Sequence, residues 1–277
     1  MSILASIKKA VPQAPVITIV GFAGSGKSTM AGMFPSPIFV QAENATSVFE
    51  TWAEDAQPAF LPQLPQPNAK RNIKTSDELF AQLRELMIEE HPFKTVVFDT
   101  ITALNLLFEQ EVVEFDDKGA TNIGEAAGGY NKGYLVVAGM HAKLRSACEH
   151  LRKKGIAVVF LSHAGVVKMK NRPDAVSEYT AFTLDMNDKS RAVYVGSSDA
   201  VLYLKAREFV SGGEENKKGQ TQKYGRVTNT GERVLITSSD GTIGYIDAKN
   251  RYSLPDEIEV NKGENPLLPL IPFYNQQ

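Results

Sequence analysis

The stretch Gly21-Phe-Ala-Gly-Ser-Gly-Lys-Ser28, followed by Thr29, decides the fold of this chain. It matches the phosphate-loop pattern G-x-x-x-x-G-K-[ST] at every fixed position. The β-branched run Val16–Val20 before it predicts a buried parallel strand, and residues 29–34 after it predict the start of a helix. Because strand, loop and helix follow in the order that the pattern needs, we interpret the stretch as a nucleotide-binding loop rather than a plain Gly/Ser-rich turn.

The loop predicts where a nucleotide would bind. Its glycines let the backbone turn tightly and leave N–H groups bare for anionic oxygens. Lys27 is expected to reach the β- and γ-phosphates, and the Ser28 hydroxyl is expected to bind Mg²⁺. The predicted ligands of the chain are therefore ATP and Mg²⁺. The residues expected to contact them are Gly21, Phe22, Ala23, Gly24, Ser25, Gly26, Lys27, Ser28 and Thr29.

A second strand carries a carboxylate that fits this chemistry. The apolar run Thr95-Val-Val-Phe-Asp99 has the Walker B pattern, so Asp99 is expected to hold Mg²⁺ through its water shell. Many ring ATPases place a Glu directly after this Asp to orient water, but here the residue is Thr100. Glu43, which follows the strand Ile38–Val40, is the best-placed substitute, and capping of the next helical turn is its alternative role.

A third buried strand, residues 156–161, ends at Ser162-His163 on the same expected edge of the sheet. A polar residue there can sense the γ-phosphate and transmit its state to the next loop. We therefore include His163 among the candidate catalytic residues, although a lone histidine is commonly structural.

The composition limits the class of protein. The chain has 277 residues, enough for one large α/β domain or for a core plus a small appendix. With 43% hydrophobic residues, 22% charged residues and a net charge of −2, it is typical of a soluble globular protein rather than a basic protein that coats nucleic acid. The single cysteine, Cys148, excludes an internal disulfide and favours a cytoplasmic location. It lies on a helix-like stretch, so a place in the core is expected rather than a role as nucleophile. No apolar run reaches the roughly 18–20 residues of a membrane span, so no membrane association is expected.

The rest of the chain predicts further elements. Thr75-Ser-Asp-Glu78 has the form of a capping box that opens a helix. A turn is predicted at 229–231, between short strands in the segment 224–247. Three parts are expected along the chain: an N-terminal arm at 1–13, a core at 14–258, and an extended, proline-containing tail at 259–277.

Two basic segments follow the third strand. Lys168, Lys170 and Arg172 lie in a polar loop that is either plainly solvated or grips a phosphate backbone. Lys205 and Arg207 follow a strand and alternate as i and i+2, so both can point the same way. No cation other than Lys27 is expected at the γ-phosphate from the first 200 residues. A finger supplied by a neighbouring subunit is therefore predicted, in a head-to-tail ring or filament.

The order of these motifs resembles a RecA-type ATPase core over roughly residues 14–258. The strand ends Ala42-Glu43 and Leu161-Ser162-His163, and the closing Ala248-Lys-Asn-Arg251, are most similar to phage-encoded minimal RecA-like ATPases. Some of these are single-strand annealing proteins of the Sak type.

The resemblance implies an α/β, RecA-like P-loop NTPase fold with a mainly parallel central sheet and C-terminal antiparallel strands. It implies that Glu43 is catalytic, that the loop at 165–177 contacts single-stranded DNA, and that Lys205 and Arg207 act on the neighbouring subunit's nucleotide. A single-strand binding protein would be a further candidate partner, and a phage protein would work in the host cytoplasm.

Three functions remain open from the sequence. The leading one is a Mg²⁺-dependent ATPase that acts on single-stranded DNA in homologous recombination or annealing. The alternatives are a small-molecule kinase, whose specificity site residues 56–72 would have to supply, and a nucleotide-switched scaffold with little turnover. Stimulation of ATP hydrolysis by single-stranded DNA, by a nucleoside or by neither separates the three.

Overall fold

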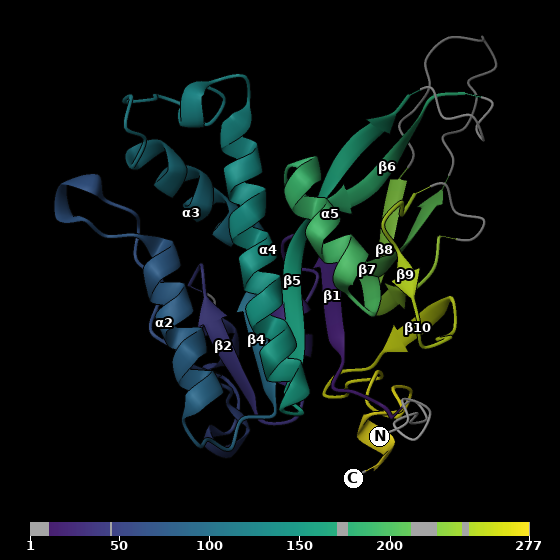
Figure 1. Cartoon of the computed structure of the whole chain (residues 1–277). Helices are drawn as coiled ribbons and strands as arrows, with labels where there is room; N and C mark the ends of the chain where they lie inside the picture. Colours follow the sequence, from purple (N-terminus) through teal and green to yellow (C-terminus); the bar gives the residue numbers. More distant parts are fainter. Residues whose placement is uncertain (1–10, 45, 171–176, 212–225, 240–243, 277) are drawn as a thin grey trace, which may run out of the picture.

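The computed structural model describes residues 11–44, 46–170, 177–211, 226–239 and 244–276. These residues build one ten-stranded sheet whose main order is β10-β8-β7-β1-β5-β4-β2-β3, with β6 paired to β5 and β9 paired to β7 (Figure 1). The expected N-terminal arm lies largely outside the described residues. Within them, no helix combines the length and the apolar character that crossing a membrane requires.

The elements have the following bounds. The strands are β1 Val16–Gly21, β2 Pro37–Gln41, β3 Ala59–Phe60, β4 Thr95–Asp99, β5 Ala157–Met169, β6 Tyr179–Leu184, β7 Ala200–Ser211, β8 Arg226–Ile236, β9 Lys249–Asn250 and β10 Glu257–Val260. The α-helices are α1 Lys27–Gly32, α2 Thr75–Ile88, α3 Ile101–Glu114, α4 Lys132–Lys153 and α5 Asp188–Ser197. Short 3₁₀ turns occur at Thr46–Phe49, Glu54–Ala56, Ala69–Arg71, Ala126–Gly128 and Tyr274–Gln276.

The sheet confirms the predicted α/β fold class. Strands β7, β1, β5, β4, β2 and β3 run parallel to their neighbours along the centre of the sheet. β8 and β10 add antiparallel strands at one edge, after β7 in the sequence. The parallel strands are rich in β-branched residues because both of their faces are covered, and all six residues of β1 are buried.

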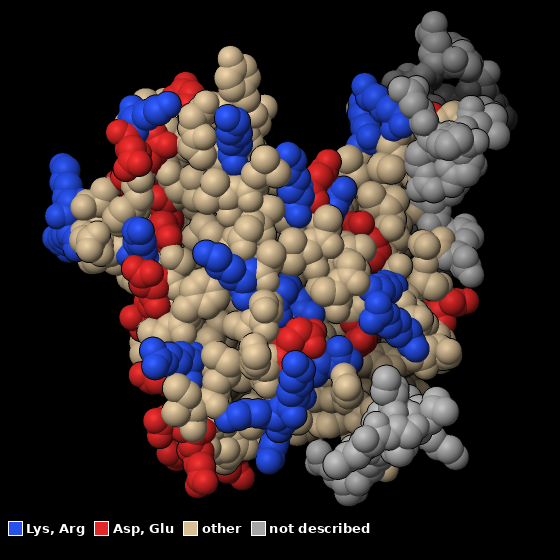
Figure 2. Space-filling model, viewed as in Figure 1, with Lys and Arg blue, Asp and Glu red and all other residues tan. Residues whose placement is uncertain are grey.

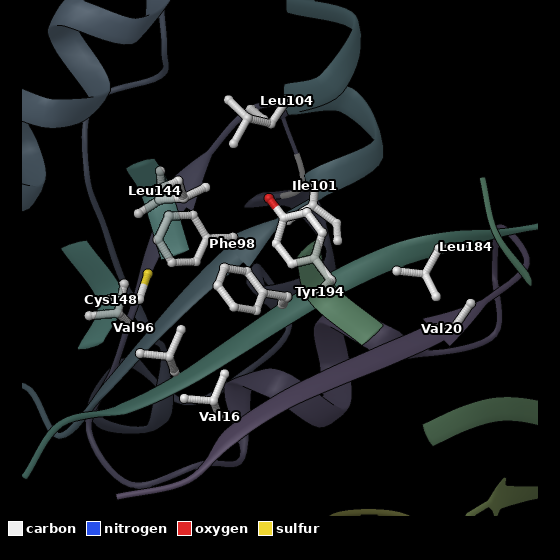
Figure 3. Close-up of a cluster of buried hydrophobic side chains, with 14 of the residues drawn as sticks. Val16, Val20, Val96, Phe98, Ile101, Leu104, Leu144, Cys148, Leu184 and Tyr194 are labelled. Carbon is white, nitrogen blue, oxygen red and sulfur yellow. The ribbon is translucent and has the colours of Figure 1, made fainter. Parts of the chain in front are cut away.

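Two layers cover the two faces of the sheet. Helices α2, α3, α4 and α5 lie on one face, where Phe98 and Phe160 of the strands pack with Tyr194 of α5 (Figures 1 and 3). Cys148 of α4 belongs to this core, as the sequence predicted, and burial raises the pKa of its thiol to about 12. Helix α1 and the C-terminal segment cover the opposite face.

The start of α2 differs from the predicted capping box. The helix begins at Thr75, so Thr75 is not the N-cap, and its hydroxyl donates to the carbonyl of Pro65 at 2.7 Å. The carboxylate of Glu111 on α3 accepts instead from the Ser76 backbone N–H at 2.8 Å and the Ser76 hydroxyl at 2.6 Å. A neighbouring helix therefore supplies the acceptor that the N-terminal N–H groups require.

The turn predicted at 229–231 is also wrong. β8 runs without a break from Arg226 to Ile236 beside β7, and the register shifts between the pairs Ala206–Arg233 and Glu208–Asn229. One β7 residue thus faces three β8 residues, of which Gly231 has φ 81°. The glycine that indicated a turn instead permits a bulge, because the long β7 strand offers partners on both sides of it.

The C-terminal segment after Val260 is not extended. It folds back through successive turns, and the side chains of Leu267 and Ile271 are completely buried against the α1 face of the sheet. Tyr274 contacts Phe34, which follows α1, with ring centroids 6.2 Å apart. The prolines indicated an extended chain. The apolar residues between them instead pack against a face of the sheet that would otherwise be exposed.

Candidate active site

The parallel strands bring the predicted motifs to one edge of the sheet. Gly21 at the end of β1 pairs with His163 on β5, and Gln41 at the end of β2 pairs with Asp99 at the end of β4. The backbone N–H groups of Ala42 and Glu43 both reach the carbonyl of Asp99, at 3.1 and 3.3 Å. A pocket of about 300 Å³ lies at this edge, and its lining includes Lys27, Ser28, Glu43, Asp99, Thr100 and His163.

The loop that closes this pocket depends on two glycines. A Cβ at Gly21 would lie 2.5 Å from the Leu204 carbonyl oxygen, so the close approach of β7 leaves no room for a side chain. Gly26 precedes α1 with φ 98°, a backbone conformation that glycine adopts without strain. Phe22 projects from the loop and packs edge-on against Phe182 of β6, with centroids 5.5 Å apart.

Lys27 is a buried cation at the floor of the loop. Its ammonium donates to the carbonyls of Gly21 at 2.9 Å and Phe22 at 3.1 Å. Burial lowers the pKa of Lys27, and the carboxylates of Asp99 and Glu43 oppose that shift. The ammonium therefore lies where it can neutralise anionic oxygens that enter the loop.

Ser28 and Asp99 are in direct contact. The Ser28 hydroxyl donates to Oδ2 of Asp99 at 2.7 Å, and Asp99 is only 2% exposed. Burial raises the pKa of Asp99, while the Ser28 hydroxyl and Lys27 act against the rise. No other hydrogen bond to the Asp99 carboxylate is found in the described part of the chain.

These two side chains fit a Mg²⁺ site. Both are oxygen donors, which is what Mg²⁺ prefers, and one carboxylate beside substrate phosphates and water is a common protein contribution. Over the described ranges no group of three or more His, Cys, Asp or Glu side chains could hold a metal ion, so a site built wholly from protein ligands is absent there.

Glu43 and His163 form the polar wall of the pocket. Oε1 of Glu43 lies 3.6 Å from Nε2 of His163, an ion-pair distance rather than a hydrogen bond. The His163 side chain lowers the pKa of Glu43, with smaller contributions from Thr100 and Lys27, against the effect of burial. Glu43 is thus ionised at neutral pH and can accept a hydrogen bond from water.

Two threonines hold this wall in place. Thr100, joined to Asp99 by a cis peptide bond, caps α3 by accepting from the Ala103 N–H at 3.1 Å. Thr102 contacts Ser162 at 3.2 Å between hydroxyls and accepts from the His163 backbone N–H at 3.0 Å. The start of α3 is therefore tied to the part of β5 that carries His163, and it follows directly after Asp99 of β4.

The predicted DNA-contacting residues lie away from this pocket. β5 continues past His163 to Met169 and pairs antiparallel with β6, so residues 165–169 form a strand where a loop was predicted, and Lys168 lies opposite Thr180. Lys168 and Lys170 are exposed. Arg172 falls outside the described residues. Lys168 lies five positions beyond His163 along the strand, a span of about 17 Å.

Lys205 and Arg207 are held by partners within their own chain. The Lys205 ammonium lies 5.6 Å from the centroid of the Tyr245 ring. Arg207 forms ion pairs with Glu232 at 3.6 Å, with Glu259 at 3.4 Å, and with Glu257. These carboxylates raise the pKa of Arg207, led by the Glu257 hydrogen bond. A role on a neighbouring subunit would require Arg207 to exchange these partners.

Arg233 of β8 also lines the pocket, and the sequence reasoning missed it. It follows directly after the β8 bulge in a run that otherwise predicts an ordinary strand. Only the pairing of β8 with β7, and of β7 with β1, brings it to the loop. No local sequence signal marks such a residue.

The chain is similar to a described protein family and to solved structures. The profile of a family described as an AAA domain matches residues 13–252. Similar solved structures include the flagellar accessory protein FlaH from Methanocaldococcus jannaschii, at 10% identity and TM-score 0.41, covering 90% of this chain and 85% of that one. The KaiC-like protein PH0186 from Pyrococcus horikoshii OT3 has 14% identity and TM-score 0.42, with coverage of 92% and 89%. No curated protein sequence matches the chain.

Proposed function

This chain belongs to the AAA domain family and has a RecA-like P-loop ATPase core, and on that premise we propose that it is a Mg²⁺-dependent ATPase of phage type that acts on single-stranded DNA in recombination or annealing. The observation that carries the proposal is the course of β5. This strand holds His163 at the nucleotide pocket and continues into a hairpin that carries exposed lysines.

The nucleotide half of the proposal rests on the pocket. Lys27 would neutralise the β- and γ-phosphate oxygens, and Ser28 and Asp99 would hold Mg²⁺, which when bound supplies further positive charge at the phosphates. Glu43 would orient the attacking water and take its proton. His163, 3.6 Å from Glu43, is placed to respond to the charge state of that carboxylate.

The DNA half rests on the hairpin of β5 and β6. Side chains two apart on a strand share a face, and Val166, 60% exposed, shares one with Lys168. Basic side chains gather at the described end of this hairpin (Figure 2). Cations beside an apolar surface are what single-stranded nucleic acid binds, through its phosphates and its bases. A single-strand binding protein would be a compatible partner.

ATP turnover measured with and without single-stranded DNA tests the proposal. We expect DNA to stimulate turnover in the wild-type protein. Stimulation by a nucleoside instead would favour a small-molecule kinase, and a turnover near zero under all conditions would favour a nucleotide-switched scaffold. Either result contradicts the proposed function.

Neutralising the basic residues of the segment 165–177 tests the DNA-binding role separately. Replacing Lys168, Lys170 and Arg172 by Gln should weaken binding to single strands and reduce the salt slope by roughly 0.7 for each phosphate that the variant no longer neutralises. A triple variant of Lys70, Arg71 and Arg84, which are exposed cations on other elements, changes the net charge equally and serves as the control. Equal salt slopes of DNA binding in the two variants would mean that these basic side chains are only solvated.

The proposal includes assembly into a head-to-tail ring or filament in which Lys205 and Arg207 act on the next subunit's nucleotide. Arg207→Ala mixed with Lys27→Ala should then recover part of the activity, because each variant supplies what the other lacks across one interface. Turnover per subunit should also rise with protein concentration. A flat concentration dependence together with an inactive mixture would exclude a finger supplied in trans.

A further inference from the structure

Strand β8 carries one arginine toward the phosphate loop. Val234 and Ile236, after Arg233, belong to the core under α2–α5, whereas Leu235 belongs to the core under α1. Because side chains alternate along a strand, Arg233 lies on the same face of the sheet as Leu235, which is the α1 face.

The Arg233 side chain lies against the loop itself. A Cβ built on Gly26 would be 3.2 Å from Nε, 3.3 Å from Cζ and 3.4 Å from Cδ of Arg233. The guanidinium group lines the same pocket as Lys27, Ser28 and Asp99. The side chain is exposed, and within the described ranges it makes no ion pair or hydrogen bond. Arg207 on the adjacent strand differs, because three carboxylates hold it.

The charges around the pocket indicate what the Arg233 guanidinium can contribute there. Without Arg233, the lining carries the carboxylates of Glu43 and Asp99 and the single ammonium of Lys27. That set is poorly suited to a polyphosphate, which adds several negative charges. A guanidinium presents several N–H donors in a planar fork, which suits phosphate oxygens better than a point charge does.

We propose that Arg233 is a second cationic contact to the phosphates of the nucleotide bound in its own chain, in addition to Lys27. The inference rests on the proposed nucleotide site and extends it by one residue. It also supplies a cation in cis that the first 200 residues do not, so nucleotide binding by a single chain does not depend on a neighbour's finger.

Nucleotide affinity of purified variants, measured by titration calorimetry, tests the inference without relying on turnover. Arg233→Gln should weaken ATP binding by about tenfold or more, which is the usual value of a hydrogen bond to a charged group. Arg233→Lys should keep part of the affinity. Arg84→Gln, an exposed arginine on α2, makes the same change of charge elsewhere and should bind ATP as the wild type does.

Shorter nucleotides identify the part of the ligand that is contacted. The decrease in affinity of Arg233→Gln should be largest for ATP, smaller for ADP and smallest for AMP, because fewer phosphate oxygens remain. An equal decrease for all three would place the guanidinium on the base or ribose and overturn the proposal. Thermal unfolding without nucleotide should be unchanged, since the Arg233 side chain makes no ion pair or hydrogen bond with the described residues.

Further outcomes separate this inference from the proposed function. If Arg233→Gln binds ATP like the wild type while Lys27→Ala does not, Arg233 is only a solvated side chain and the nucleotide site stands. If the wild type binds no ATP, both proposals fail together. If mixing Arg233→Gln with Lys27→Ala restores a site of wild-type affinity, the contact is made in trans, which also overturns the inference.

Discussion

Two buried aspartates lie at opposite edges of the same sheet, and their surroundings differ. Asp99 ends β4 at the edge that carries the phosphate loop, and it is 2% exposed. Asp199 precedes β7 at the opposite edge, where β1 begins, and it is 4% exposed. The two residues have the same chemistry and nearly the same burial, so their partners distinguish them.

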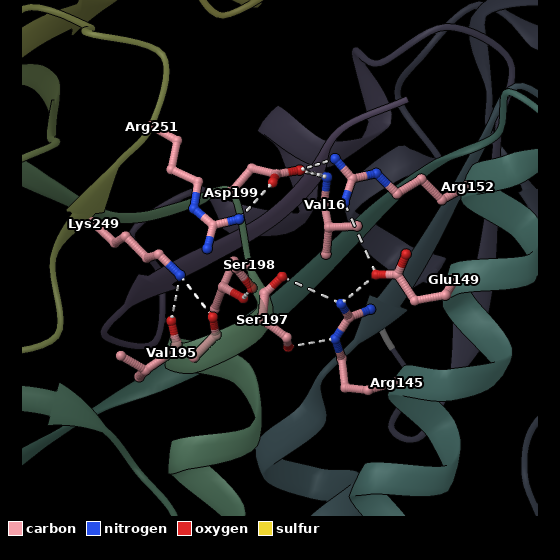
Figure 4. Close-up of polar contacts among 12 residues, drawn as sticks. Val16, Arg145, Glu149, Arg152, Val195, Ser197, Ser198, Asp199, Lys249 and Arg251 are labelled. Atoms are coloured by element: carbon pink, nitrogen blue, oxygen red, sulfur yellow. Dashed lines mark hydrogen bonds and ion pairs between the residues drawn. The ribbon is translucent and has the colours of Figure 1, made fainter. Parts of the chain in front are cut away.

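Asp199 is surrounded by donors from three parts of the chain (Figure 4). Its carboxylate accepts from the Val16 N–H at 3.0 Å, from Arg152 of α4 at 2.9 Å and from Arg251 at 3.3 Å. These interactions tie the first strand to a helix and to the end of β9. A buried carboxylate with this many donors is satisfied, and its role is to hold elements together.

Among the described residues, Asp99 has one donor, the Ser28 hydroxyl, and burial raises its pKa. Its remaining acceptor capacity faces a pocket that also contains Lys27 and Glu43. A buried charge with too few hydrogen-bond or charge partners is energetically unfavourable. Such groups are found at functional sites, where a ligand or metal ion supplies the missing partners. The comparison teaches that incomplete satisfaction, more than burial, separates the candidate functional acid from the structural one.

The largest expected effect is at the edge of the sheet that carries the phosphate loop and Asp99. Lys27→Ala should reduce ATP affinity by about 10³-fold, because the variant cannot make two charge-assisted hydrogen bonds to phosphate, each of which contributes roughly 1.5–3 kcal/mol. Binding of a fluorescent ATP analogue measures this. Unchanged affinity would mean that the loop does not bind phosphate and that the contrast between the two edges is not functional.

Glu43→Gln should separate binding from turnover. The amide keeps the size of the side chain but cannot accept a proton, so turnover should fall by about 10²-fold or more while ATP affinity stays near the wild-type value. Single-turnover hydrolysis measures the chemical step directly. Wild-type turnover in this variant would exclude Glu43 as the group that activates water. The capping role that the sequence left open falls to Asn44, whose Oδ1 accepts from the Thr46 N–H at 3.3 Å.

Substitutions of the two aspartates test the comparison itself. Asp199→Asn should lower the free energy of unfolding by about 3 kcal/mol, because Arg152 and Arg251 lose their buried counter-charge. Asp99→Asn should leave stability unchanged or slightly higher while it weakens the Mg²⁺ dependence of nucleotide binding. Urea unfolding of both variants provides the measurement, and equal destabilisation by the two would remove the distinction drawn here.

The smallest expected effect is a pH dependence. The folded-state pKa of Asp99 is raised above its usual 3.8, so the folded protein holds this proton in a pH range where the unfolded chain has lost it. Stability of the wild type relative to Asp99→Asn should therefore be greatest in acid and should decline as the pH rises above about 3.8, and then level off. A relative stability that increases with pH over this range would contradict a raised pKa.

Much of the candidate site was predictable because it consists of local patterns. The loop at 21–28, the strand ending at Asp99 and the strand ends at Glu43 and His163 are each short runs of sequence. The rule that parallel strands end at a common edge places them together. The free, buried Cys148 followed from similar reasoning about a helix face.

By itself the sequence determined the strand–loop–helix unit, the α/β class and the identity of the acids at the strand ends, because each depends on residues a few positions apart. Only the tertiary structure decided which groups fill the remaining roles. Glu111 caps α2 from another helix, Leu267 and Ile271 fold the tail onto the α1 face, and Arg233 reaches Gly26 across two strand pairings. These contacts join residues separated by 35 to more than 200 positions, and their partners are set by packing of the whole sheet, which no local pattern encodes.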